Sequence, residues 1–258
     1  MFKKIIILYM TFVFNLLSLP AIAQELHAVD LQPWKIGAEI FVNSKLFESD
    51  FGDIGGGLYA TDDPGIDVNT EKGAFTPGNW LRFHPVGQLL FWNGTEWSQQ
   101  VPNGERIEVI DAHGNIISYS VDGVSSIPAT IDKVDSEGAV HTHIYFSIFD
   151  ASGALGGSIG AYRIELRLFE SKPDSDISVS IAPSPVAIVF NRGLEHEKFE
   201  SAVSAAADLE DNSIFVAETG TLNIQRVKAL GSYYQAKLKH LGDNKFELVD
   251  VKEIKTKE

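Results

Sequence analysis

Two histidines separated by a single residue, His141 and His143, are the side chains of this sequence best suited to chemistry. They lie in the run AVHTHIYFSIF, whose alternation predicts one β-strand over 139–149 with an apolar face. Side chains two positions apart on a strand point to the same side, so both imidazoles should lie opposite the core, beside Tyr145. Such a pair can hold zinc, iron or manganese if neighbouring strands supply further ligands.

The histidine pair supplies two ligands, whereas a zinc site needs three or four. Glu165 is a candidate because it falls on the non-core face of the predicted strand 161–169, and His84 and His113 are others. We therefore expect a divalent ion, Zn²⁺ first, at a site made of His141, His143, Glu165 and His84. A solvent-facing strand that carries two histidines without a metal is the alternative.

An acidic loop offers a second kind of cation site. The segment DDPGIDVN spaces oxygen ligands in a way that can wrap Ca²⁺, through Asp62, Asp63, Asp67 and Asn69. It lacks the glycine and terminal glutamate spacing of an EF-hand, so a solvated loop without an ion is the favoured alternative.

A tryptophan-bearing hairpin suggests a different ligand. Asn93-Gly94 is typical of a two-residue type I′ turn, which would pair Trp92 with Thr95 and Leu90 with Trp97. Trp92 and Trp97 would then share one face and could stack against a sugar ring. The alternative is that both indoles are part of the core.

Evidence for an enzyme is weak. Gly156 to Gly160 matches the G-x-S-x-G pattern of a nucleophile elbow, but an elbow needs a helix after the serine, and a strand is predicted there. Spacing alone identifies no general base for the histidine site. We therefore favour a protein without catalytic activity.

Composition excludes further classes. The chain has 258 residues, no cysteine and a formal net charge of -14. Without cysteine there is no disulfide scaffold, thiolate metal site or cysteine nucleophile. The acidic balance argues against nucleic-acid binding, which requires clustered Lys and Arg.

The first 23 residues have the features of a secretory signal peptide. Lys3 and Lys4 precede an apolar run too short to span a membrane comfortably, and Ala21-Ile22-Ala23 forms a small-residue cleavage site. Cleavage there would remove two lysines and no acid, which takes the charge from -14 to -16. We expect a periplasmic or secreted protein with no membrane span after cleavage.

The remaining chain predicts a mainly β fold in three parts. Residues 24–193 alternate in short apolar runs broken by turn residues, as in an antiparallel, jelly-roll-like β-sandwich. Residues 194–209 predict one helix, because its apolar residues recur at helical spacing. That apolar stripe is Leu194, Phe199, Ala202, Val203 and Ala206. Residues 210–258 predict an antiparallel meander of about four strands.

Several segments resemble a family of uncharacterised exported bacterial β-proteins, many of which carry a C-terminal PEP-CTERM sorting tail. The matching segments are Asp63 to Ile66, Leu89 to Gly94, the histidine pair followed by Phe146, Gly160 to Tyr162, and Val189 to Leu194 followed by Phe199 and Ala202. The resemblance implies an exported β-sandwich and no established activity. The sorting tail is missing here, so the resemblance does not imply envelope anchoring by that route.

Taken together, these patterns predict an exported, non-enzymatic β-sandwich that binds a divalent metal through its His-x-His strand. A carbohydrate- or cell-envelope-binding module that uses Trp92 and Trp97 is the alternative.

Overall fold

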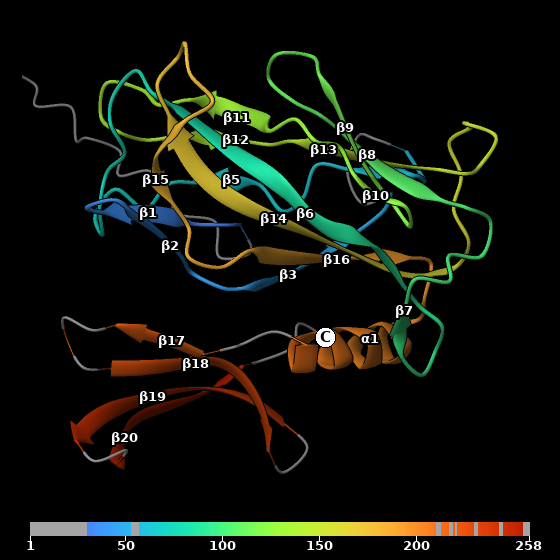
Figure 1. The fold of residues 1–258 in the computed structure, drawn as a ribbon. Helices are drawn as coiled ribbons and strands as arrows, with labels where there is room; N and C mark the ends of the chain where they lie inside the picture. Colours follow the sequence, from blue (N-terminus) through green and yellow to red (C-terminus); the bar gives the residue numbers. More distant parts are fainter. Residues whose placement is uncertain are drawn as a thin grey trace, which may run out of the picture.

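The computed structural model describes residues 30–52, 57–209, 213–216, 219, 221–229, 232–242 and 245–254. These residues form a mainly β fold with a single α-helix (Figure 1), which confirms the fold class predicted from the sequence. The predicted signal peptide, residues 1–23, lies outside the described residues.

The largest sheet has nine strands and is organised around β14 (Gly160–Ser171). Along one side β14 pairs with β6 (Trp80–Trp92) over almost its whole length; along the other it pairs first with β16 (Val186–Arg192) and then with β15 (Ser178–Ile181). The sheet is completed by β1 (Pro33–Ile36), β2 (Glu39–Val42), β3 (Leu46–Asp50), β7 (Trp97–Ser98) and β11 (Ala129–Lys133). Two of its pairings, β15 with β2 and β16 with β3, are parallel.

A second, five-stranded sheet and a two-stranded sheet complete the sandwich. The five strands lie in the order β10 (Gly123–Val124), β9 (Ile116–Ser120), β8 (Arg106–Ile110), β13 (Tyr145–Phe149) and β4 (Ala60–Thr61). The short pair consists of β5 (Ile66–Asp67) and β12 (His141–Thr142).

The main core draws its buried side chains from both large sheets. The nine-stranded sheet contributes Phe83, Leu89, Tyr162, Ile164, Leu166, Leu168, Ile188 and Phe190, and the five-stranded sheet contributes Ile107, Val109, Ile117, Tyr119, Phe146 and Ile148. Burial of each large aliphatic or aromatic side chain stabilises the fold by about 1.5–3 kcal/mol. The alternation read from the sequence therefore identified the core faces of β13 and β14.

The other face of the nine-stranded sheet is partly covered by α1 (His196–Leu209). The helix buries Phe199, Ala202, Val203 and Ala206, as its spacing predicts. These residues pack on Trp92, Ala161 and Val189 of the sheet. The helix begins two residues later than expected, because the main-chain oxygen of Glu195 accepts the first helical hydrogen bonds, from Lys198 and Phe199.

The chain over 35–42 forms the β1–β2 hairpin, because Gly37 takes a positive φ of 62° and reverses its direction.

One predicted strand is broken in the structure. The strand predicted over 139–149 is divided into β12 and β13, with His143 and Ile144 between them. This break decides where the two histidines lie.

The C-terminal residues form the predicted antiparallel meander. Its strands are β17 (Ser213–Val216), β18 (Thr221–Ala229), β19 (Ser232–Gly242) and β20 (Lys245–Ile254). In the described part of the chain these four strands hydrogen-bond only to one another. None of the helical residues described forms a segment long and apolar enough to cross a membrane.

Candidate metal site

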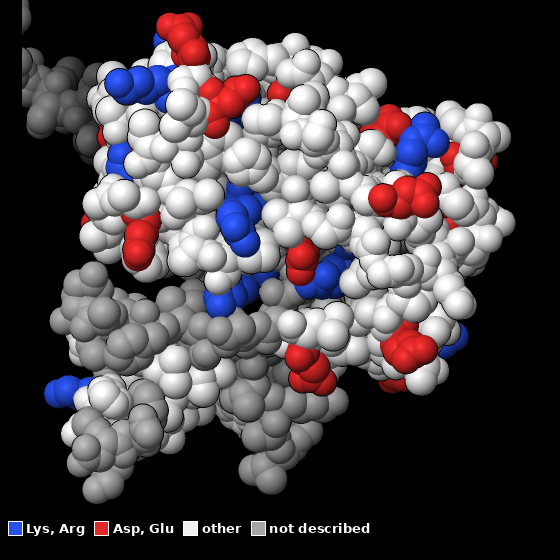
Figure 2. All heavy atoms as spheres, in the orientation of Figure 1, with Lys and Arg blue, Asp and Glu red and all other residues white. Residues whose placement is uncertain are grey.

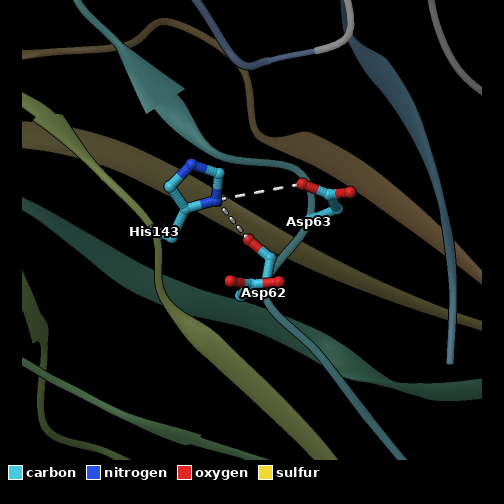
Figure 3. A group of neighbouring side chains, drawn as sticks. All are labelled: Asp62, Asp63 and His143. Atoms are coloured by element: carbon cyan, nitrogen blue, oxygen red, sulfur yellow. Dashed lines mark hydrogen bonds and ion pairs between the residues drawn. The ribbon is translucent and has the colours of Figure 1, made fainter. Parts of the chain in front are cut away.

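Three side chains from two distant segments form a group with metal-binding chemistry: Asp62, Asp63 and His143. Each offers one ligand atom, and these three atoms lie within 4.8 Å of one another. The aspartates follow β4, and the histidine occupies the break between β12 and β13. Figure 3 shows the imidazole pointing toward both aspartates.

The imidazole is oriented by its Nδ1 atom. Nδ1 of His143 lies 3.0 Å from the main-chain oxygen of Asp62 and 3.8 Å from Oδ1 of Asp63 (Figure 3). With a proton on Nδ1, the ring donates to that carbonyl. When the same nitrogen carries no proton, its lone pair faces the same side, toward Asp62 and Asp63, where a cation could bind.

The short β5–β12 pairing brings the two segments together. His141 lies opposite Asp67 and Thr142 opposite Ile66, so the acidic loop and the histidine segment run side by side. Gly65 allows the close approach, because a Cβ atom there would lie 2.8 Å from Cε1 of His143 and 3.0 Å from Oδ1 of Asp30. A side chain at this position would displace the imidazole.

Two further aspartates, Asp30 and Asp67, are buried near the group, and Asp62 and Asp63 are partly buried. The Oδ1 atom of Asp62 is buried and accepts no hydrogen bond. A buried carboxylate oxygen without a donor costs free energy, and a bound cation would recover it.

Of the predicted histidine pair, His143 belongs to the group and His141 does not. Their ring centroids lie 6.3 Å apart, and the ring planes are nearly perpendicular at 89°. His141 belongs to a separate pair, with its Nδ1 3.5 Å from Oδ1 of Asp67. The break in the strand removes the i, i+2 geometry on which the His-x-His prediction rested.

His84 and Glu165, predicted to complete the site, are not part of the group. His84 lies on β6, and its ring stacks on Phe169 with the centroids 4.3 Å apart. Burial is the main cause that lowers the pKa of His84, and the positive charges of Arg82 and Arg167 lower it further. Glu165 is bound by Arg163 on β14. A cation would be repelled by these guanidiniums, so the arrangement does not support these two residues as ligands.

The other candidates have structural roles. His113, at the β8–β9 turn, packs edge-on against Trp80 with centroids 4.8 Å apart. Asn69 of the predicted calcium loop accepts a hydrogen bond from the main chain of Lys72 through Oδ1. Of the four predicted calcium ligands, the structure therefore places Asp62 and Asp63 in the group with His143.

The tryptophan hairpin has a different register from the predicted one. Trp92 lies opposite Trp97, because the connection is a four-residue loop in which Oδ1 of Asn93 accepts from the main chain of Thr95 and Glu96. Trp92 is only 7% exposed, and Nε1 of Trp97 donates to the main-chain oxygen of Ala202 at 3.0 Å. The indoles thus hold α1 on the sheet rather than forming an open platform for a sugar.

The serine of the G-x-S-x-G match lies in a loop that leads into β14, as the sequence predicted. Its hydroxyl donates to Glu105, which also accepts from the main chain of Asn103. Burial would raise the pKa of Glu105, but these hydrogen bonds outweigh it and lower the pKa. Ser158 therefore anchors the loop to a charged carboxylate.

No protein-family model, curated protein or solved structure matches this chain. The function of the chain is therefore inferred from its own residues. The group of His143 with the two aspartates was missed from the sequence, where the histidine and the acidic loop were assigned to separate sites. The aspartates at 62, 63 and 67 and the histidines at 141 and 143 were the available signals, but nothing local indicated that the two segments pair.

Proposed function

We propose that this protein is an exported, non-enzymatic β-sandwich protein that binds a divalent metal ion through Asp62, Asp63 and His143. The observation that carries the proposal is the convergence of three ligand atoms within 4.8 Å, one from an imidazole and two from carboxylates. Mixed nitrogen and oxygen ligands of this kind are typical of zinc. The main-chain oxygen of Asp62 would be a fourth ligand, because it already lies 3.0 Å from Nδ1 of His143.

The proposed metal is Zn²⁺, with Ca²⁺ as the comparison. An imidazole nitrogen favours zinc, whereas Ca²⁺ prefers six to eight oxygen ligands. The two carboxylate ligands of the group favour a divalent cation over a monovalent one. A structural or storage role fits this chemistry without a reaction.

Isothermal titration of the purified protein with Zn²⁺, Mn²⁺ and Ca²⁺ tests the proposal. We expect Zn²⁺ to bind most tightly and His143→Ala to weaken its binding at least about tenfold, or 1.4 kcal/mol. His141→Ala is the matched control, because it removes an imidazole two positions away and leaves the three-residue group intact. Failure of every ion to bind below about 1 mM would overturn the proposal.

Export is proposed from the N-terminal sequence and has its own test. Residues 1–23 carry the basic start, apolar run and cleavage site of a signal peptide. N-terminal sequencing of the protein recovered from the periplasm or medium should begin at Gln24. Recovery of the full-length chain from the cytoplasm alone would contradict export.

A further inference from the structure

The face of β6 and β14 turned away from the main core carries basic side chains in an otherwise acidic protein. Arg167 lies directly opposite His84 in the strand register, and Phe169 lies opposite Arg82. Arg163 lies on the same face as Arg167, four positions earlier on β14. Figure 2 has the orientation of Figure 1, in which β14 and β6 run side by side, and basic side chains reach the surface in that part of the view.

Two of the three guanidiniums are neutralised by carboxylates. Arg82 contacts Asp176 at 2.6 Å, and Arg163 is bound to Glu165. The side chain of Arg167 has no ion pair among the described residues, and its Nε atom is shielded from solvent and has no hydrogen-bond partner there. Within the part of the chain that the structure describes, one positive charge on this face is therefore left without an anion.

The ring beside Arg167 is a neutral hydrogen-bonding group. His84 stacks on the fully buried Phe169 at 4.3 Å with an angle of 11° between the rings, which fixes its orientation. Burial, followed by the charges of Arg82 and Arg167, lowers the pKa of His84, so the imidazole is uncharged at neutral pH. A neutral imidazole can donate one N–H to an oxygen atom.

We propose that this face binds a small oxyanion, a phosphate or a carboxylate, through the guanidinium of Arg167 with His84 as a neutral hydrogen-bond donor. Guanidinium groups recognise such anions through two parallel N–H donors, and partial burial strengthens the interaction. Arg82 adds positive charge from the neighbouring strand while staying bound to Asp176. The anion would bind the terminal N–H groups of the Arg167 guanidinium, because its Nε atom is shielded from solvent.

Nuclear magnetic resonance of the ¹⁵N-labelled mature protein tests this proposal through the Arg Nε–H signals. Sodium phosphate and sodium acetate are titrated separately at low ionic strength, with sodium chloride as the reference for ionic strength. We expect at least one oxyanion to shift the Arg167 signal saturably, with chloride producing no saturable shift. Saturation by phosphate alone or acetate alone tells which oxyanion class the site takes.

Variants separate this site from general charge effects. Arg167→Gln should weaken binding at least about tenfold, and Arg167→Lys should weaken it less because the charge remains without the planar fork. Arg106→Gln is the matched control, since Arg106 is bound to Glu108 on the other sheet. The proposal would be overturned if Arg106→Gln weakened oxyanion binding as much as Arg167→Gln does, or if neither oxyanion produced a saturable shift. Arg167→Gln should still bind Zn²⁺, which shows that the loss of oxyanion binding is independent of the proposed metal site.

Discussion

The Nδ1 atom of His143 lies 3.0 Å from the main-chain oxygen of Asp62, although 81 positions separate the two residues in the chain. The contact joins the loop after β4 to the break between β12 and β13. It brings an imidazole to a pair of adjacent carboxylates, which is the smallest unit that could hold a metal ion in this fold.

Gly65→Ala should weaken zinc binding about tenfold, because the new Cβ would lie 2.8 Å from Cε1 of His143 and push the ring from its position. Calorimetry measures the change. Gly156→Ala is the control, since its Cβ would meet its nearest atom, Oδ2 of Asp150, at an ordinary 3.5 Å. Equal affinities for the two variants would show that the approach at Gly65 does not position the imidazole.

Zinc should raise the stability of the wild-type protein. A ligand that binds only the folded state at 100 times its Kd stabilises it by about 2.7 kcal/mol. The double variant Asp62→Asn/Asp63→Asn should lose this gain, because both carboxylate ligands are gone. Thermal unfolding followed by circular dichroism, with and without zinc and then with a chelator, makes the comparison. A zinc-induced rise in Tm that survives in the double variant would place the metal elsewhere.

Trp97→Phe should destabilise the docking of α1 by about 1 kcal/mol, because it removes the hydrogen bond from Nε1 to Ala202 and keeps most of the ring. Trp97→Ala should cost about 3 kcal/mol through the cavity it leaves. Urea unfolding measures both. Zinc affinity should stay unchanged, since the hairpin contributes nothing to the metal group. A phenylalanine variant as stable as the wild type would mean that the hydrogen bond adds no net stability.

Ionised Glu170 stabilises the fold, and this contribution is lost at acid pH. Burial would raise its pKa, but hydrogen bonds from Lys35, Asn79, Thr76 and Ser180 outweigh this and lower the pKa below the ordinary 4.5. Because the folded state has the lower pKa, this contribution is present above pH 4.5 and is lost as the pH falls through the folded value.

Glu170→Gln should therefore be less stable than the wild type by about 3 kcal/mol at neutral pH, because it leaves the largely buried ammonium group of Lys35 without its carboxylate partner. This difference in the free energy of unfolding should narrow at pH values below 4.5. Denaturant unfolding at pH 7 and at acid pH gives the two differences. Glu96→Gln, at an exposed position, should show no gap at either pH. A gap of the same size at both pH values would contradict the assigned ionisation.

Local patterns identified the strands and their buried faces but not every strand end. Tyr162, Ile164, Leu166 and Leu168 are buried, as alternation on β14 predicts. The hairpin register was predicted wrongly, because Asn93-Gly94 also suits a four-residue loop in which the asparagine side chain accepts two main-chain hydrogen bonds. Asn93-Gly94 suits both the two-residue turn and the four-residue loop, so the choice between these two connections depends on how Trp97 packs against α1.

The candidate site was predictable only in part. Asp62, Asp63 and His143 were each singled out by residue type, but the first two were assigned to calcium and the third to a site with Glu165 and His84. Glu165 on β14 and His84 on β6 lie beside arginines, on the face of the sheet turned away from the main core. A cation is disfavoured there. Sequence spacing carries no information on which charges surround a residue in three dimensions.

By itself the sequence determined the mainly β fold, the single helix with its apolar stripe and the C-terminal meander, because each depends on periodicity within a short segment. The tertiary structure alone decided that the acidic loop meets His143 and that Arg167 lies beside His84 with no ion pair among the described residues. Both juxtapositions arise from pairing between strands far apart in the chain. That pairing is selected by the packing of the whole sandwich, so no local pattern could specify it.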